Sequence, residues 1–418
     1  MKKILILAYD FPPYNSIGGQ RPYAWFKYLN EFGYEPIVVT RHWDNPVSNP
    51  IDYIQPTQSK TVLKEMLDNG TIYRVPFFPN KRDELLIKHG LNKFKFLRKV
   101  LSFYYLIFEF VSFKFDNKRE LFIEAQKVLK EHKITAIIAT GEPFILFRYA
   151  SLLSKNNNVP WIADYRDGWS TNYTRSKWGK LFYSEIEKNI VSSATIVTAA
   201  SAEFAEQLKK LLNKNVSVLL NGYFEEKFNS LELSNKPNKF IISFAGTLYP
   251  YQPIELFAKG FSVFSSGEKK DVVLRFIGLK FYEEQVLRIK KAFESISADV
   301  EFTDRLPHEK TIELLNQSSV LLLPASPQYP QIYAKVFDYL ALHKNIILCK
   351  SDEGSLEKII SETNSGCICN TAEEVAIALK KMYIEWREKG YVTCNSTGIE
   401  KYSRRNQTKK LAEVLDGV

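Results

Sequence analysis

The stretch that decides the fold is KKILILAYDFPPYNSIGGQRPYAWFKYLN, residues 2–30. It begins with the apolar run Ile4–Ala8, which is typical of a strand that is covered on both faces of its sheet. A loop with two adjacent glycines follows, and Pro22 suits the first turn of a helix that ends near Asn30. The stretch therefore predicts a strand, a loop and a helix in the order found in parallel sheets.

The same alternation continues along the 418 residues. In the first half we expect further strands at Ile37–Thr40, Ile72–Val75, Ala136–Thr140, Trp161–Asp164, Ile196–Ala199 and Val216–Leu220. In the second half we expect strands at Ile241–Ala245, Val272–Ile277, Val300–Thr303, Val320–Leu323, Ile346–Leu348 and around Ile368. Helical patterns lie between these runs, so the sequence predicts an α/β fold with two Rossmann-like, doubly wound domains that face each other across a cleft.

A polar stretch near residues 223–238 separates the two halves. We therefore expect an N-terminal domain at 1–225 and a C-terminal domain at 238–395. Residues 396–418 are expected to form a C-terminal helix that packs back on the N-terminal domain.

The composition excludes several classes of protein. With 45% hydrophobic and 25% charged residues, the chain is neither disordered nor collagen-like. Its four cysteines form no CxxC pair and lie at no ligand spacing to a histidine, so neither a disulfide framework nor a zinc site is expected. The first apolar run is too short for a signal peptide, and no run reaches the roughly 18 residues of a membrane span. We expect a cytoplasmic protein.

The net charge of +10 is concentrated in one segment. Residues 88–119 hold eight basic and two acidic side chains, and residues 94–115 hold nine aromatic ones. This pattern predicts an insertion that lies on an anionic membrane surface, at the inner face of the cell membrane. The alternative is an insertion whose aromatic side chains pack on the first domain. A nucleic-acid partner is not expected, because the second domain has no matching basic face.

The loop after the first strand is a candidate anion site. Gly18 and Gly19 let backbone N–H groups approach an anion at a helix start, and Arg21 adds a grip for phosphate or carboxylate. The alternative is a plain turn between a strand and a helix.

Two further loops of the first half follow strands. One carries Thr140, Gly141 and Glu142, where Thr140 either caps the next helix or lies near a ligand. The other holds the charged residues Asp164, Arg166 and Asp167 and then Trp169. We expect these residues to bind sugar hydroxyls or stabilise charge, with Trp169 as a flat surface for a sugar. The alternative is an ion-pair network within the loop.

A fourth candidate is the segment Lys335–Ala341 in the second half. Lys335 and Asp338 are three residues apart and share one face of the predicted helix. The lysine suits a diphosphate, and the carboxylate suits both hydroxyls of a ribose. The alternative is an ordinary salt bridge between the two side chains.

Over residues 1–415, these motifs together resemble the retaining glycosyltransferases of the GT-B fold, in the large family-4-like group. The branch that it resembles builds bacterial surface polysaccharides. The segments that carry the resemblance are Phe11–Gly19, Thr140–Pro143, Pro160–Asp167, Asn221–Gly222, Phe244–Leu248 and Lys335–Ala341.

The resemblance implies a hexosyltransferase that uses a nucleotide diphosphate sugar and a glycan or lipid-linked acceptor. The first domain then faces the acceptor and the second binds the nucleotide sugar. The implied donor-binding residues are Gly18, Gly19, Arg21, Gly246, Thr247, Arg305, Leu306, Lys335, Val336 and Asp338. The implied acceptor-binding residues are Thr140, Gly141, Glu142, Asp167 and Trp169, and the implied catalytic residues are Asp164, Arg166 and Lys335. The loop Asp304–His308 is expected to contact the base through its backbone.

The chain departs from the family's pattern at three places. Thr247 stands where the family usually has an Arg and a Lys that hold the diphosphate, so that role passes to Lys335, Arg21 and backbone amides. Pro330 occupies the place of a second glutamate, and the acceptor-side loop lacks a histidine. No DxD motif occurs, so we expect neither an essential metal nor a cofactor.

Two other functions stay open at this point. One is a nucleotide-sugar epimerase on the same fold, against which the small number of histidines argues. The other is a non-catalytic, membrane-associated assembly protein, which the missing Arg and Lys make credible. The base, the sugar and the acceptor stay open as well.

Overall fold

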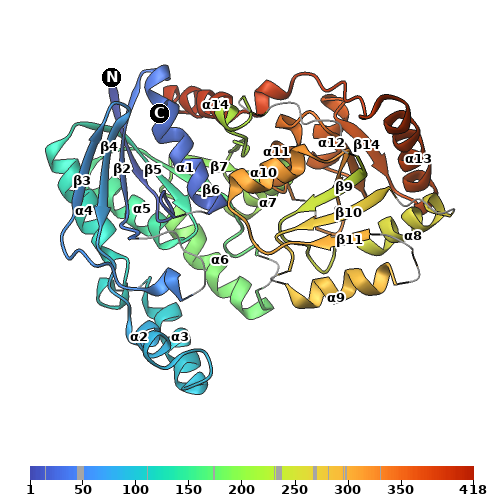
Figure 1. Cartoon of the computed structure of the whole chain (residues 1–418). Coiled ribbons are helices and arrows are strands. Elements are labelled where there is room, and N and C mark those ends of the chain that lie inside the picture. Colours follow the sequence, from blue (N-terminus) through green and yellow to red (C-terminus); the bar gives the residue numbers. More distant parts are fainter. Residues whose placement is uncertain are drawn as a thin grey trace. The chain divides into compact units, whose positions relative to one another are not determined.

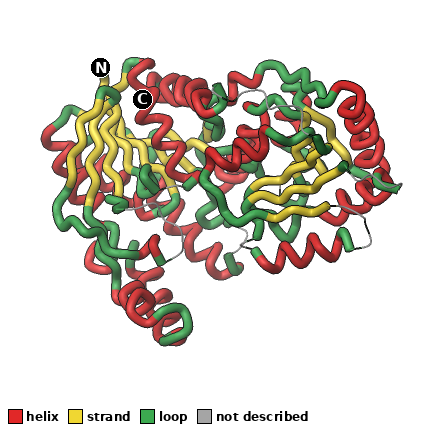
Figure 2. Tube along the Cα trace, in the orientation of Figure 1, coloured by secondary structure: helices red, strands yellow, loops and turns green. Residues whose placement is uncertain are grey.

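The computed structural model describes residues 1–14, 16–44, 51–110, 112–172, 175–229, 231, 238–266, 271–280, 282–294, 296, 299–329 and 331–418. These residues form two compact units, each built on one sheet (Figures 1 and 2). Unit 1 comprises residues 1–220 and 407–418, and unit 2 comprises residues 221–406. The division thus falls at Leu220 and Asn406, where the sequence pattern predicts boundaries at 225–238 and 395.

The described sheet of unit 1 has the strand order β3-β4-β2-β1-β5-β6-β7-β8. The strands are β1 (Lys2–Leu7), β2 (Tyr34–Arg41), β3 (Leu63–Leu67), β4 (Gly70–Val75), β5 (Ile134–Gly141), β6 (Trp161–Tyr165), β7 (Ile196–Ala199) and β8 (Val216–Val218). All pairings are parallel except that of β3 with β4. The strand order reverses next to β1, which is the place where doubly wound sheets bind ligands. The predicted parallel strands of this half are confirmed.

Alternate residues of β1 enter two different cores, which is why its sequence is apolar from Ile4 to Leu7. Leu5 and Leu7 pack in one cluster together with α4, α5, α6 and α7. Ile4 and Ile6 pack in a second cluster with α1 and α14. The helices of unit 1 are α1 (Ile17–Tyr28), α2 (Lys81–His89), α3 (Lys95–Phe108), α4 (Arg119–Glu131), α5 (Ile145–Asn157), α6 (Lys177–Val191), α7 (Ala202–Leu212) and the greater part of α14 (Arg404–Asp416). The sheet is therefore covered on both faces.

Unit 2 repeats this plan with a sheet of order β11-β10-β9-β12-β13-β14, in which every pairing is parallel. Its strands are β9 (Phe240–Ala245), β10 (Val272–Ile277), β11 (Asp299–Phe302), β12 (Val320–Leu323), β13 (Asn345–Cys349) and β14 (Gly366–Cys369). Its helices are α8 (Ile254–Phe264), α9 (Glu283–Ala292), α10 (His308–Asn316), α11 (Lys335–Ala341), α12 (Ser355–Glu362) and α13 (Ala372–Lys389). Short 3₁₀ segments lie at Leu29–Phe32, Asp52–Ile54, Phe113–Phe115, Glu225–Lys227 and Ile399–Tyr402. The prediction of two Rossmann-like α/β domains is confirmed.

In the part of the chain that the structure describes, no helix combines the length and the apolar character that crossing a bilayer requires.

The C-terminal helix belongs to the core of unit 1. Leu411 and Leu415 of α14 are buried beside Trp25 of α1 and Ile6 of β1. The hydroxyl of Tyr34 donates a hydrogen bond to Asp416 over 2.6 Å, which fixes the end of the helix.

Leu411→Ala is expected to lower the free energy of unfolding by about 2–5 kcal/mol, because it leaves a cavity where α14 meets the sheet. Urea unfolding followed by circular dichroism measures the change. Glu413→Ala, on the exposed side of the same helix, is the matched control and should change the value by less than about 0.5 kcal/mol. Equal effects of the two substitutions would contradict this packing.

Candidate functional site

In unit 2, the loop after β9 begins with a glycine that turns the chain. Gly246 has a φ of +82°, in the left-handed region where a glycine is favoured. Its N–H donates to the carbonyl of Ile277 over 2.9 Å, which holds the turn at the carboxyl end of the sheet. The next carbonyl, that of Thr247, accepts a hydrogen bond from Lys335 Nζ over 3.2 Å. The structure therefore brings Gly246, Thr247 and Lys335 together.

Lys335 is a cation in an apolar setting. Its ammonium group lies 3.8 Å from the centre of the Phe244 ring, and burial lowers the pKa of Lys335 to about 7. No carboxylate of the described residues forms an ion pair with it. A desolvated ammonium group without a counter-ion is an anion site, because a bound anion supplies the missing charge.

Asp338 lies one turn further along α11 and pairs with a residue whose side chain the sequence pattern does not single out. Its Oδ2 atom lies 2.9 Å from Nε2 of His308, the first residue of α10. Lys227 Nζ in turn lies 3.3 Å from Nδ1 of His308. The alternative of a salt bridge between Lys335 and Asp338 is therefore wrong. The sequence predicts that the loop Asp304–His308 lies at the donor site, but it predicts contacts from the backbone only. The contact of the His308 side chain with Asp338 was therefore missed.

Two more of the predicted donor residues meet at Tyr282. Thr247 Oγ1 donates to the Tyr282 hydroxyl over 3.2 Å, and Arg305 Nη2 donates to the same oxygen over 2.6 Å. Arg305 is exposed, and Leu306 beside it is half-buried. Val336 points the other way, because its side chain is fully buried and its N–H donates to the carbonyl of Tyr333. The expectation that Val336 binds the donor is therefore not met by its side chain or its N–H.

A group of tyrosines next to Lys335 was not predicted. The rings of Tyr249 and Tyr251 stack with their centres 5.4 Å apart, and Tyr333 stacks on Tyr249 at 6.2 Å. Tyr249 and Tyr251 follow β9, and Tyr333 precedes α11. Both segments lie next to predicted donor-binding residues, and this position in the sequence could have pointed to the tyrosines. Pro330, the place of the family's second glutamate, lies outside the described residues.

In unit 1, Arg21 and Asp164 form a buried ion pair rather than a ligand site. Nε and Nη2 of Arg21 donate to the Asp164 carboxylate over 3.0 and 2.6 Å, and both side chains are about 1% exposed. The hydroxyls of Thr140 and Thr198 donate to the same carboxylate over 2.9 and 2.7 Å. Arg21 Nη1 donates to the carbonyl of Leu220.

This network corrects three expectations. Asp164 is not a catalytic group that contacts a sugar, Arg21 does not hold a phosphate, and Thr140 does not face an acceptor. The reason is that α1 turns Arg21 inward, where burial without a partner would be strongly unfavourable. The alternative of an ion-pair network is correct for Asp164, although its partner Arg21 comes from α1 and not from the same loop.

Arg166 connects the loops that follow three strands. Its Nε donates to the carbonyl of Gly141 over 2.8 Å, its Nη2 to that of Glu142 over 2.5 Å, and its Nη1 lies 3.9 Å from Asp10. A Cβ atom at Gly18 would come within 1.7 Å of Arg166 Nη1, so a side chain at position 18 would displace the guanidinium group from this position. The loops at this edge of the sheet are thereby fixed to one another.

The start of α1 provides a second set of contacts there. Gly19 donates its N–H to Ser16 Oγ over 2.9 Å, which caps the helix. Ser16 Oγ donates to Asp10 Oδ2, and burial raises the pKa of Asp10. Glu142 and Asp167 are exposed and remain accessible to an acceptor.

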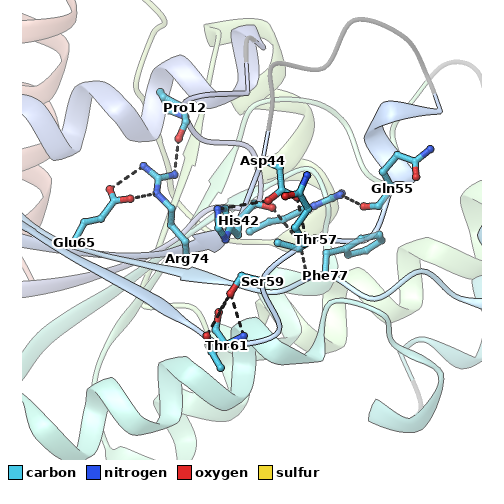
Figure 3. A network of polar contacts seen from close by, with 12 residues as sticks. Pro12, His42, Asp44, Gln55, Thr57, Ser59, Thr61, Glu65, Arg74 and Phe77 are labelled. Atoms are coloured by element: carbon cyan, nitrogen blue, oxygen red, sulfur yellow. Dashed lines mark hydrogen bonds and ion pairs between the residues drawn. The ribbon is translucent and has the colours of Figure 1, made fainter.

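The loop after β1 is held on its other side by Arg74 of β4. Figure 3 shows Arg74 between Glu65 and Pro12: Nε donates to Glu65 over 2.7 Å and Nη1 to the carbonyl of Pro12 over 2.6 Å. In the same view, the hydroxyl of Thr57 accepts from the N–H of Phe77 and donates to the carbonyl of His42. The Phe11–Gly19 segment is therefore placed by side chains far from it in sequence.

Trp169 does not offer a flat surface to a sugar. It is 1% exposed, and its ring stacks on Phe144 at 5.0 Å and on Phe110 at 5.2 Å. The expectation that it binds an acceptor is wrong, because the ring fills the core beside α5.

Among the described residues, no three His, Cys, Asp or Glu side chains are grouped in a way that could hold a metal ion. The predicted independence from metals stays a prediction.

Comparisons with solved structures identify the fold. HepE of Anabaena, solved with UDP and glucose, matches with a TM-score of 0.62 and 13% identity over all of both chains. Sucrose-phosphate synthase of Thermosynechococcus elongatus matches with a TM-score of 0.61 and 14% identity, over all of this chain and 99% of its own. A trehalose-6-phosphate protein of E. coli bound with UDP-2-fluoro glucose gives 0.62 and 9%, again over all of this chain and 99% of its own. The chain has the GT-B fold.

Sequence comparisons add little to the fold. No family model matches the chain. A curated relative, the type II methyltransferase M.HincII of Haemophilus influenzae, is 24% identical over 301 residues, which cover 63% of this chain. The match spans 59% of that relative's length.

Asp164→Ala is expected to destabilise unit 1 by about 3–5 kcal/mol, because it leaves the Arg21 guanidinium group buried without its partner. Thermal unfolding measures the loss. Asp167→Ala, three residues away and exposed, is the control and should change stability by no more than about 0.5 kcal/mol. An Asp164→Ala protein that is as stable as the wild type but has lost turnover would restore the catalytic assignment.

Proposed function

We propose that the protein is a glycosyltransferase that moves a hexose from a nucleotide diphosphate sugar to a glycan or lipid-linked acceptor. The observation that carries the proposal is the ammonium group of the half-buried Lys335, which lies 3.8 Å from the centre of the Phe244 ring without a counter-ion among the described residues. The fold supports it, because HepE was solved with UDP and UDP-glucose.

In this proposal the diphosphate lies at Lys335, with the backbone of Gly246 and Thr247 beside it. Asp338, held by His308 at 2.9 Å, accepts hydrogen bonds from the two ribose hydroxyls. Arg305 is exposed at the same loop cluster, where it interacts with the donor. These residues all belong to unit 2, so a nucleotide is expected to bind this unit by itself.

The reaction breaks the bond between the sugar's anomeric carbon and the phosphate oxygen. Negative charge develops on the departing diphosphate, and a preorganised cation stabilises that charge in the transition state. Lys335 supplies the cation. The acceptor hydroxyl forms the new glycosidic bond and passes its proton to the departing phosphate oxygen. We further propose retention of the anomeric configuration, no essential metal, and a role in surface polysaccharide synthesis on the inner face of the cell membrane.

The match to M.HincII makes methyl transfer to DNA the second candidate function. Nucleotide-sugar epimerisation is the third, and donor binding without turnover is the fourth.

Incubation with a panel of nucleotide sugars, with S-adenosylmethionine and DNA as a parallel arm, separates all four. We expect nucleoside diphosphate release in the first arm that rises when an acceptor is added and survives EDTA. Methylated DNA, a second sugar isomer or tight donor binding without release would each overturn the proposal.

The affinity for UDP is expected to fall about tenfold between pH 6 and pH 8. Lys335 in the free protein has a pKa of about 7, so its charged, binding-competent fraction falls about tenfold as the pH rises through that value. Isothermal titration calorimetry at the two pH values measures the change. Lys335→Met is the matched control. It should bind UDP weakly, and its affinity should not show the tenfold fall between pH 6 and pH 8. The same pH dependence in both proteins would contradict the role of the lysine.

Asp338→Ala is expected to weaken UDP binding about tenfold or more, because it removes charge-assisted hydrogen bonds of about 1.5–3 kcal/mol. Asp299→Ala, at the amino end of β11 and far from the loops that follow the strands, should leave affinity unchanged. Folding should be preserved, since Asp338 is partly exposed. Unaltered affinity in a folded Asp338→Ala protein would refute the ribose site.

A further inference from the structure

Helix α3 carries an apolar face that nothing in the described residues covers. No residue of α3 is buried, and Figure 1 shows α2 and α3 standing away from the sheet of unit 1. Phe96, Val100 and Phe103 recur at helical spacing on one face, and they are 82%, 48% and 65% exposed. Exposed apolar side chains that gather on a projecting helix indicate a surface that binds another protein or a membrane.

Basic side chains flank this apolar face. Lys95 and Lys99 lie along one border of it, and Arg98 lies on the opposite side of the helix. Residues 88–108 contain five basic side chains and no acidic one. A helix with an apolar face and a basic face is typical of proteins that lie in the headgroup region of an anionic bilayer.

The aromatic segment that contains α3 divides into two parts. Tyr104 and Phe108 contact Phe115, while Phe110 and Phe113 pack against the core of unit 1. The packed alternative therefore holds for the later aromatic residues. The most exposed apolar side chains lie between Phe96 and Phe103 of α3, while Leu106 and Phe108 near its end are 38% and 36% exposed.

A second exposed apolar group begins α6. Trp178, Leu181 and Phe182 are 83%, 64% and 43% exposed, and they face away from the buried Tyr183 and Val191 of the same helix. Residues 175–182 hold three basic side chains, Arg175, Lys177 and Lys180, and no acidic one.

The two groups are connected within unit 1. Phe110, two residues after α3, lies with its ring centre 5.2 Å from Trp169 and 6.5 Å from Tyr183 of α6. The chain that leaves α3 is thus packed against the helix that exposes Trp178.

We propose that the exposed faces of α3 and α6 together form a docking surface for an anionic lipid bilayer. Eight basic and no acidic side chains in the two segments match a negatively charged surface, and the polar N–H of an exposed tryptophan suits the interface between water and lipid. The Trp178 group supplies a second contact in addition to the amphipathic helix. This inference does not depend on the transfer reaction proposed above.

Vesicle co-sedimentation of the full chain tests it. We expect binding to vesicles of phosphatidylcholine with 30% phosphatidylglycerol, about tenfold weaker binding to pure phosphatidylcholine, and weaker binding to the anionic vesicles as the salt concentration rises. Phe96→Ser with Phe103→Ser should weaken binding about tenfold or more, and so should Trp178→Ser with Leu181→Ser. Lys95→Glu with Lys99→Glu leaves the apolar side chains in place. This variant should weaken binding to the anionic vesicles and leave the binding to pure phosphatidylcholine unchanged.

The control is Leu287→Ser with Ile377→Ser, which removes two equally exposed apolar side chains from α9 and α13 of unit 2. It should bind vesicles like the wild type. All variants should bind UDP equally, which separates this inference from the proposed function. The proposal would be overturned if the wild type did not bind vesicles, or if the control variant lost as much binding as the α3 and α6 variants. It would also be overturned if the wild type formed a dimer and the α3 and α6 substitutions abolished the dimer without changing vesicle binding.

Discussion

The proposed chemistry depends on one unbalanced charge. Lys335 lies against the Phe244 ring, donates to a single carbonyl, and has no carboxylate partner in the described part of unit 2. Burial makes the charged form of this lysine unfavourable, and this disadvantage disappears only when an anion arrives. The turn at Gly246 and the carbonyl of Thr247 lie beside that group. In the proposal, the loops at this edge of the second sheet hold a cation ready for a diphosphate.

Unit 1 shows the opposite treatment of charge. Arg21 and Asp164 are equally buried, but each satisfies the other, and two threonine hydroxyls complete the carboxylate's hydrogen bonds. A fully paired group has no capacity left for a ligand, whereas an unpaired one does. In the proposal, charged side chains thus serve structure in unit 1 and binding in unit 2, and the difference lies in the partner rather than in the sequence motif. We propose that the exposed Glu142 and Asp167, in loops that Arg166 connects, contact the acceptor.

The strands and the two-domain plan could be predicted from the sequence, because a strand that is covered on both faces, such as β1 from Ile4 to Leu7, is apolar at successive positions. Strand β3 was missed, since most of its side chains are exposed and the charged Lys64 and Glu65 interrupt its apolar residues. Lys335 and Asp338 were singled out from their spacing and from the family resemblance, and their roles stay a prediction. Asp164, Arg21 and Trp169 were predicted to contact ligands because they follow strands in the sequence. A position after a strand indicates which residues come close together, but it does not indicate which side chains point into the core. His308 and Tyr249 were missed because the sequence separates them widely from Asp338 and Tyr333, their partners in the fold.

The most direct test is the pKa of Lys335, measured by NMR on protein with isotopically labelled lysine methylene groups, and with Lys335→Met to assign the signal. The account predicts titration near 7 in the free protein, an upward shift of that pKa when UDP is added, and no shift with uridine, which lacks the phosphates. A lysine that titrates near its ordinary value of about 10.4, or one whose pKa does not respond to UDP, would contradict the claim that this buried cation binds the diphosphate.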